Sequence, residues 1–71
     1  MSNSFREGAA VRWPWGTGEG HGKVLRRFER RVRRTIKGER IVRNGSKANP
    51  AYLIKTEDSQ VLKLGSELLD H

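Results

Sequence analysis

The 71-residue chain has no cysteine, only two histidines and two prolines, and no long hydrophobic run. Without cysteine it cannot form a disulfide, a thiol nucleophile or a cysteine-ligated zinc site. Its longest unbroken apolar run, residues 51–54, is far shorter than the roughly 20 residues of a membrane-spanning helix. The polar start, residues 1–8, is unlike a secretory signal. We therefore expect a cytoplasmic protein with no membrane partner.

Residues suited to catalysis or to cofactor binding are scarce. His21 lies in a glycine-rich segment and His71 is the last residue of the chain, so neither is placed as a metal ligand or a general base. The glycines at 16, 18, 20 and 22 fail the phosphate-loop pattern, because that pattern needs glycine where Thr17 stands and serine or threonine where Val24 stands. The sequence predicts that the protein is not an enzyme and has no metal or other cofactor.

The positive charge is concentrated in one part of the chain. Fifteen Lys and Arg residues against eight acidic ones give a net charge of +7, and residues 23–43 contain ten of the basic residues but only two acidic ones. Such a stretch is typical of a solvated, solubilising face, or of an anion-binding surface. Arginine favours the second interpretation, because its planar group binds phosphate through two hydrogen bonds. The candidate nucleic-acid-binding residues are Arg26, Arg27, Arg30, Arg31, Arg33, Arg34, Arg40 and Arg43.

Five aromatic residues are present, and most are expected in the core of so small a domain. Trp13 and Trp15 are two positions apart, so a strand would place them on one face. Trp15 runs directly into the glycine-rich segment and is the best candidate for an exposed aromatic. Trp13, Trp15 and Tyr52 are the candidate aromatic interaction residues.

Several segments carry clear local signals. Residues 5–15 alternate as a half-buried strand that should end at Pro14 or lie at a sheet edge, and residues 16–22 are predicted to form a flexible loop. Residues 51–56 and 60–64 are short apolar runs joined by a polar turn, which predicts a hairpin. Ser66 is expected to cap a single closing turn through Leu69.

The basic stretch 23–37 is ambiguous. On a helical wheel its apolar residues fall on one arc and its basic residues opposite them, which is the pattern of an amphipathic helix. Its β-branched residues Val32, Thr35 and Ile36 favour strands instead. As one strand it would place Arg26, Arg30 and Arg34 among the apolar residues, unless a turn or a bulge reset the register. Periodicity alone favours the helix.

A family resemblance bears on this choice. It is carried by residues 11–13, 22–24, 35–38, 42–44, 49–54, 61–63 and 66–68, of which the Asn-Pro-Ala-Tyr-Leu-Ile run at 49–54 and Ser-Glu-Leu at 66–68 are the most specific. Together they resemble the hypervirulence-associated protein Tudor-like domain, a small bacterial and fungal family without an established molecular activity. The resemblance implies an all-β fold, a small SH3-like or Tudor-like barrel of about five strands with a short C-terminal helical turn, and places residues 23–37 in strands. The core residues expected for that barrel are Val11, Trp13, Val24, Phe28, Ile36, Ile41, Leu53, Ile54, Val61 and Leu62.

The expected organisation is a disordered start (1–4), one domain (5–69) and a tail (70–71), in a monomer. The expected function is that of a non-enzymatic binding module whose arginine-rich face binds nucleic acid weakly and without reading its sequence. The alternative is a protein-protein interaction module that uses exposed aromatics or a strand edge, in which the basic face only solubilises. Tudor domains that read methylated side chains enclose them in an aromatic cage, to which only Trp13, Trp15 and Tyr52 could contribute here.

Overall fold

The computed structural model describes residues 5–69, and the expected disordered start (1–4) and tail (70–71) lie outside this range. In the described range the chain forms strands with turns between them, and its one helical element is a short 3-10 turn. The elements are β1 (Ala10–Trp15), β2 (Gly18–Phe28), β3 (Arg31–Ile36), β4 (Glu39–Asn44), β5 (Ala51–Lys55), β6 (Gln60–Leu64) and the 3-10 turn η1 (Gly65–Glu67). The expected all-β fold is confirmed, with six strands rather than about five.

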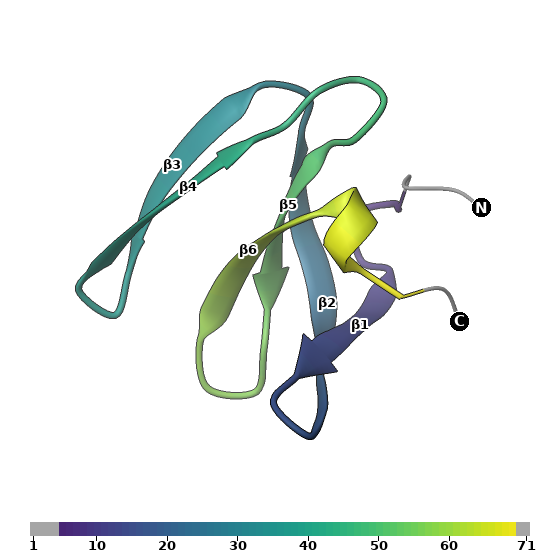
Figure 1. Cartoon of the computed structure of the whole chain (residues 1–71), viewed down its shortest axis with the longest axis vertical. Coiled ribbons are helices and arrows are strands. Elements are labelled where there is room, and N and C mark those ends of the chain that lie inside the picture. The colour runs from purple at the N-terminus through teal and green to yellow at the C-terminus, as the bar shows by residue number, and fades with distance from the viewer. Residues whose placement is uncertain (1–4, 70–71) are drawn as a thin grey trace.

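The strands form a curled four-stranded sheet and a separate hairpin. The sheet has the order β1-β2-β5-β6 with antiparallel neighbours, and β3 pairs with β4 alone. Figure 1 shows the β3–β4 hairpin as an arm beside the sheet, with β3 outermost and β4 on the side of β6. The two layers together make a half-barrel whose β4 and β6 lie close without a backbone ladder between them.

The basic stretch 23–37 is β-structure, so the helix that its periodicity favours is wrong. The register between β2 and β5 shifts between Val24 and Arg26, which marks a bulge at Leu25. Because of this extra residue, Val24 faces one side of the sheet while Leu25 and Phe28 pack on the other. A bend at Glu29 and Arg30 then starts β3. The stretch thus contains both the bulge and the turn that a strand interpretation requires.

The glycine-rich segment is not the flexible loop that its composition predicts. Only Gly16 and Thr17 form the turn, and Gly18 to Gly22 belong to β2 and pair with β1. Glycine is required here because of close packing: a Cβ at Gly20 would lie 2.5 Å from Nε1 of Trp13, and one at Gly22 would lie 2.2 Å from the Lys55 carbonyl oxygen. Small residues let these backbones approach their neighbours.

Two small cores hold the layers together. The first contains Val11, Trp13, Val24, Tyr52, Ile54 and Leu68, and the second contains Val32, Ala51, Leu53 and Leu62. Six of the ten expected core residues are buried, and Phe28, Ile36, Ile41 and Val61 are partly buried against these clusters. The second core lies between the β3–β4 hairpin and the sheet, so Val32 fixes the position of the arm.

Residues in the turns determine where β3, β4 and the closing 3-10 turn begin and end. Lys37 and Gly38 both have positive φ (51° and 80°), as a two-residue hairpin turn between β3 and β4 requires. The predicted hairpin of residues 51–56 and 60–64 is confirmed as β5–β6. Ser66 does not cap the closing turn: the Glu67 carboxylate accepts the Leu64 N–H (2.8 Å), while Ser66 exchanges two hydrogen bonds with the Asn49 side chain.

Candidate functional site

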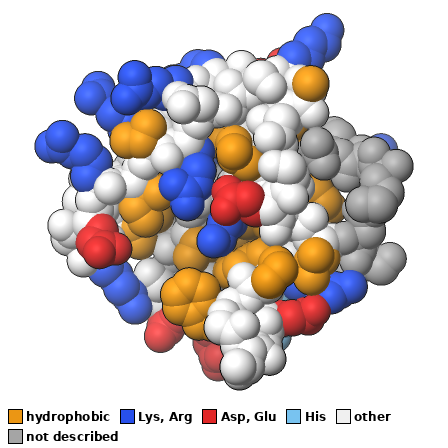
Figure 2. All heavy atoms as spheres, in the orientation of Figure 1, with side chains coloured by type: hydrophobic (Ala, Val, Ile, Leu, Met, Phe, Trp, Pro, Cys, Tyr) orange, Lys and Arg blue, Asp and Glu red, His pale blue; other side chains and the backbone are white. Residues whose placement is uncertain are grey.

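The outer face of the β3–β4 hairpin gathers exposed arginines. Since alternate residues of a strand face opposite sides, Val32 and Ile36 point to the second core while Arg31, Arg33 and Thr35 point outward. The register then puts Arg40 opposite Thr35, on the same outer face. In Figure 2 the Lys and Arg side chains gather at the upper left, over this hairpin.

A shallow hollow of about 220 Å³ adjoins this face, and Arg34, which strand alternation places on the side of Val32 and Ile36, also lines it. Its lining consists of Arg33, Arg34, Thr35 and Arg40, and it contains no carboxylate. Three guanidinium groups and one hydroxyl are all hydrogen-bond donors toward an anion, and guanidinium groups favour planar or tetrahedral oxyanions. The chemistry of this hollow therefore suits phosphate, sulfate or carboxylate oxygens.

Phe28 holds two guanidinium groups at the base of the hairpin, and one of them, that of Arg34, also lines the hollow. Arg30 and Arg34 lie over its ring, 5.4 and 5.2 Å from the centroid. Cation–π contacts at such distances restrict long side chains without neutralising their charge. Phe28 is half-buried against the second core, so this platform is itself fixed. The arrangement orders Arg34 beside the hollow that it lines.

Two of the candidate arginines are engaged with carboxylates. Arg43 donates from Nε to Glu67 (3.2 Å) and from Nη1 to the Val42 carbonyl (3.0 Å), which links β4 to the closing turn. Arg27 pairs with Glu29. Hydrogen bonding to Tyr52, and then to Glu29, raises the pKa of Arg27 above its ordinary value. Arg26 is exposed on β2, away from the hairpin's outer face.

The aromatic candidates separate by burial. Trp15 is 67% exposed, whereas Trp13 is 4% and Tyr52 0% exposed. The Tyr52 hydroxyl accepts the Phe5 N–H (2.9 Å) and its ring meets Phe5 edge-on, so Tyr52 is a core residue. Trp13 and Trp15 line a groove of about 660 Å³ that runs between β1, β4 and β6. One exposed ring does not make an aromatic cage.

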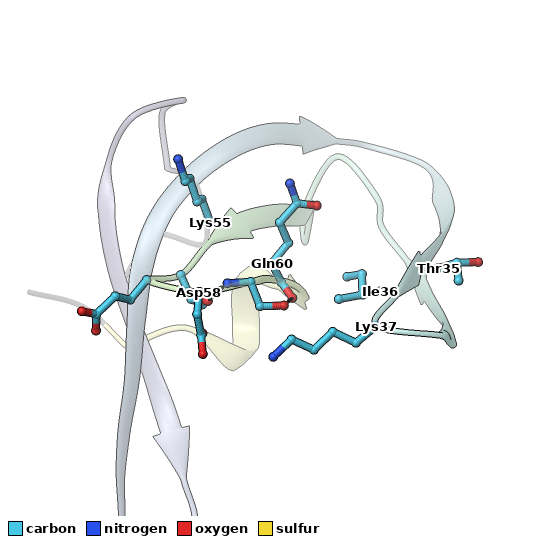
Figure 3. A pocket seen from close by; sticks show the side chains of 9 residues that line it. Thr35, Ile36, Lys37, Lys55, Asp58 and Gln60 are labelled. Carbon is cyan, nitrogen blue, oxygen red and sulfur yellow. Dashed lines mark hydrogen bonds between the residues drawn. The ribbon is translucent and has the colours of Figure 1, made fainter.

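A second hollow, of about 470 Å³, lies between the β3–β4 turn and the β5–β6 turn. Lys37 extends across it from the first turn toward the second, where Asp58 and Gln60 stand (Figure 3). Its ionic side chains are of both signs, two lysines and two carboxylates, and the hollow is open and polar.

Residues 5–69 contain no group of three or more His, Asp or Glu side chains arranged to hold a metal ion. Over the same residues, no helix is long and apolar enough to cross a membrane.

Sequence reasoning found the arginines but missed the residues that arrange them. Phe28 was expected only in the core, Thr35 had no assigned role at the site, and Glu67 was unassigned. The proximity of Phe28 to Arg30 was visible in the sequence, but the contact with Arg34 depends on the bend between β2 and β3. Thr35 joins the hollow only through the β3–β4 register.

Comparison with known proteins gives one positive finding. The family model described as "Hypervirulence associated proteins TUDOR domain" matches residues 8–68. Neither the curated proteins nor the solved structures contain a match to this sequence. The matched range covers every strand of the half-barrel and its closing turn, in agreement with the resemblance carried by residues 49–54 and 66–68. The chain therefore belongs to the family of hypervirulence-associated TUDOR domains.

Proposed function

We propose that the protein is a binding module that attaches to nucleic acid through phosphate contacts of the β3–β4 hairpin, without reading base sequence. The family supports a binding module rather than an enzyme. The observation that carries the nucleic-acid proposal is the hollow lined by Arg33, Arg34, Thr35 and Arg40, which contains no carboxylate. A phosphate seated there receives hydrogen bonds from groups that otherwise repel one another.

The absence of a base-reading element supports the sequence-blind part of the proposal. The described residues include no helix that could enter the major groove, and the exposed Trp15 lies on the groove between β1 and β6 rather than on the hairpin's outer face. Specific readout requires contacts to base edges, whereas phosphate contacts only position a protein on the duplex. We expect weak affinity that depends steeply on salt.

Fluorescence anisotropy with a random-sequence DNA duplex tests this proposal. If about four phosphates are neutralised, the slope of log K against log salt is about −3.6. The double variant Arg33→Gln, Arg40→Gln should lower affinity at low salt and make the slope shallower by about 1 to 2. A Lys47→Gln, Lys55→Gln variant is the matched control, because it removes the same charge from two exposed positions outside the hairpin.

The comparison of the two variants decides the outcome. Equal losses of affinity would mean that only net charge matters, and the hairpin would then be no binding site. No binding by the unaltered chain at low salt would reject the proposal, because the electrostatic contribution is largest there.

A further inference from the structure

The β3–β4 hairpin has a free backbone edge as well as a basic face. The Gly45 N–H donates to the Arg30 carbonyl (3.2 Å), which identifies Arg30 and Gly45 as a hydrogen-bonded pair of the ladder. Antiparallel pairs alternate between bonded and non-bonded, so Val32–Arg43, Arg34–Ile41 and Ile36–Glu39 are bonded pairs as well. The N–H and C=O groups of Arg31, Arg33 and Thr35 therefore point away from β4.

This edge of β3 is open in the part of the chain that the structure describes. Within residues 5–69 the hairpin is a two-stranded sheet whose only ladder joins β3 to β4, and β4 contacts β6 more extensively than β3 does. Arg31, Arg33 and Thr35 are all exposed. In Figure 1 β3 forms the outer margin of the arm. Such a row of free donors and acceptors is a template for another strand.

Charge selects which strand the edge accepts. A second copy of β3 would place arginines opposite arginines, which is unfavourable, so the edge disfavours pairing with itself. In an antiparallel added strand, the residues opposite Arg31, Arg33 and Thr35 carry their side chains on the same outer face as these residues. Acidic side chains at those alternate positions would meet Arg31, Arg33 and Arg40.

We propose that the β3 edge binds an extended acidic peptide as an added antiparallel strand, with Asp or Glu at every second position. The backbone groups of Arg31, Arg33 and Thr35 supply the ladder, and the guanidinium groups of the outer face select the acidic side chains. This proposal uses the same arginines as the nucleic-acid proposal but does not depend on it, because a duplex makes no use of the backbone edge.

The test is an amide NMR titration of the full chain with the peptide acetyl-Thr-Glu-Val-Glu-Val-Glu-Thr-amide. Saturable shifts should centre on the amides of Arg31, Arg33 and Thr35. The same peptide methylated on the backbone nitrogens of two Glu residues keeps its charge but loses two ladder donors, and should bind at least tenfold more weakly. Replacing Glu by Gln in the peptide should also weaken binding. Equal binding of the methylated and unmethylated peptides would overturn the proposal, since only charge attraction would remain.

Substitutions at Thr35 test the backbone ladder without changing the charge of the hairpin. Thr35→Pro removes an outward N–H without changing the charge, and proline is tolerated on an edge strand. It should reduce peptide binding at least tenfold, whereas Thr35→Val, which keeps the N–H, should bind peptide as the unaltered chain does. If Thr35→Pro fails to fold, the methylated peptide still decides. Peptide binding without duplex binding would reject the nucleic-acid proposal alone, and the reverse would reject the added strand alone.

Discussion

Some glycines in β2 are needed because a side chain there would collide with the neighbouring strand. Gly22 faces a Lys55 carbonyl that a Cβ would approach to 2.2 Å, and Ile54 Cγ2 would lie at 2.8 Å. Because the carbonyl is backbone, the neighbouring strand itself would have to move. Gly22→Ala should therefore lower the free energy of unfolding by about 1–3 kcal/mol, the usual cost of overpacking. Gly18→Ala is the control, because its Cβ would meet nothing nearer than 4.0 Å.

Thermal unfolding of the two variants measures the difference. A loss of 1 kcal/mol corresponds to about 4–8 °C in Tm for a domain of this size. Gly18→Ala should unfold close to the unaltered chain and Gly22→Ala clearly below it. Similar Tm values for both variants would mean that the β2–β5 contact at Lys55 is looser than the structure shows. No sequence signal distinguishes these two glycines, since only the pairing of β2 with its neighbours places Gly22 against Lys55.

At the scale of elements, the β3–β4 hairpin depends on one small core for its position. Val32 is 3% exposed and packs with Ala51, Leu53 and Leu62. Val32→Ala should cost about 1–3 kcal/mol through lost burial and a residual cavity. Val42→Ala is the matched control, because Val42 is only half-buried and faces outward opposite Arg33.

Amide hydrogen exchange locates the effect of Val32→Ala. Protection should fall first in β3 and β4, because this hairpin shares no ladder with the sheet and can open locally. Protection of β1 and β2 should fall less. Uniform loss of protection over all strands would show that the hairpin and the sheet unfold as one unit, contrary to this prediction.

The β5–β6 hairpin and the stretch 23–37 show how far the sequence predicts the fold. The β5–β6 hairpin was predictable because its two apolar runs and polar turn act locally. For residues 23–37, the apolar spacing mimics a helix because a bulge at Leu25 and a bend at Glu29 each change which side the residues face. An amphipathic helix and a strand interrupted by a bulge and a bend give the same spacing of apolar residues. Periodicity therefore cannot distinguish the two structures, whereas the family resemblance does.

The sequence predicted that basic residues are concentrated in one stretch, but it did not predict which of them share one surface. The ten basic residues of 23–43 were evident in the sequence. In the structure Arg43 pairs with Glu67 and Arg27 with Glu29. Arg33, Arg34 and Arg40 line one hollow together. That partition depends on the β3–β4 register and on Glu67, which is 24 positions from Arg43 in the sequence. Tyr52 was a candidate interaction residue, because nothing local shows that its hydroxyl meets the Phe5 backbone in the core.

At the scale of the whole molecule, a net charge of +7 on a body of 27 × 26 × 22 Å should make stability depend on salt. At about 0.01 M salt the screening length is roughly 30 Å, so every charge acts on every other across the molecule. At about 0.15 M it is roughly 8 Å, and only neighbours interact. Added salt therefore relieves repulsion among the arginines, while the exposed pairs Arg12–Glu19 and Arg27–Glu29 contribute too little to offset this gain.

We expect Tm to rise by about 4–8 °C, equivalent to roughly 1 kcal/mol, between 0.01 and 0.15 M sodium chloride. The variant Arg33→Gln, Arg40→Gln should start from a higher Tm at low salt and show a smaller rise, because two of the crowded charges are gone. The Lys47→Gln, Lys55→Gln variant should retain more of the rise, since its charges lie outside the hairpin. A Tm that falls with salt would show that attractive ion pairs outweigh the repulsion. Repulsion among the hairpin's arginines would then not destabilise the fold, and a bound anion would have no such repulsion to relieve.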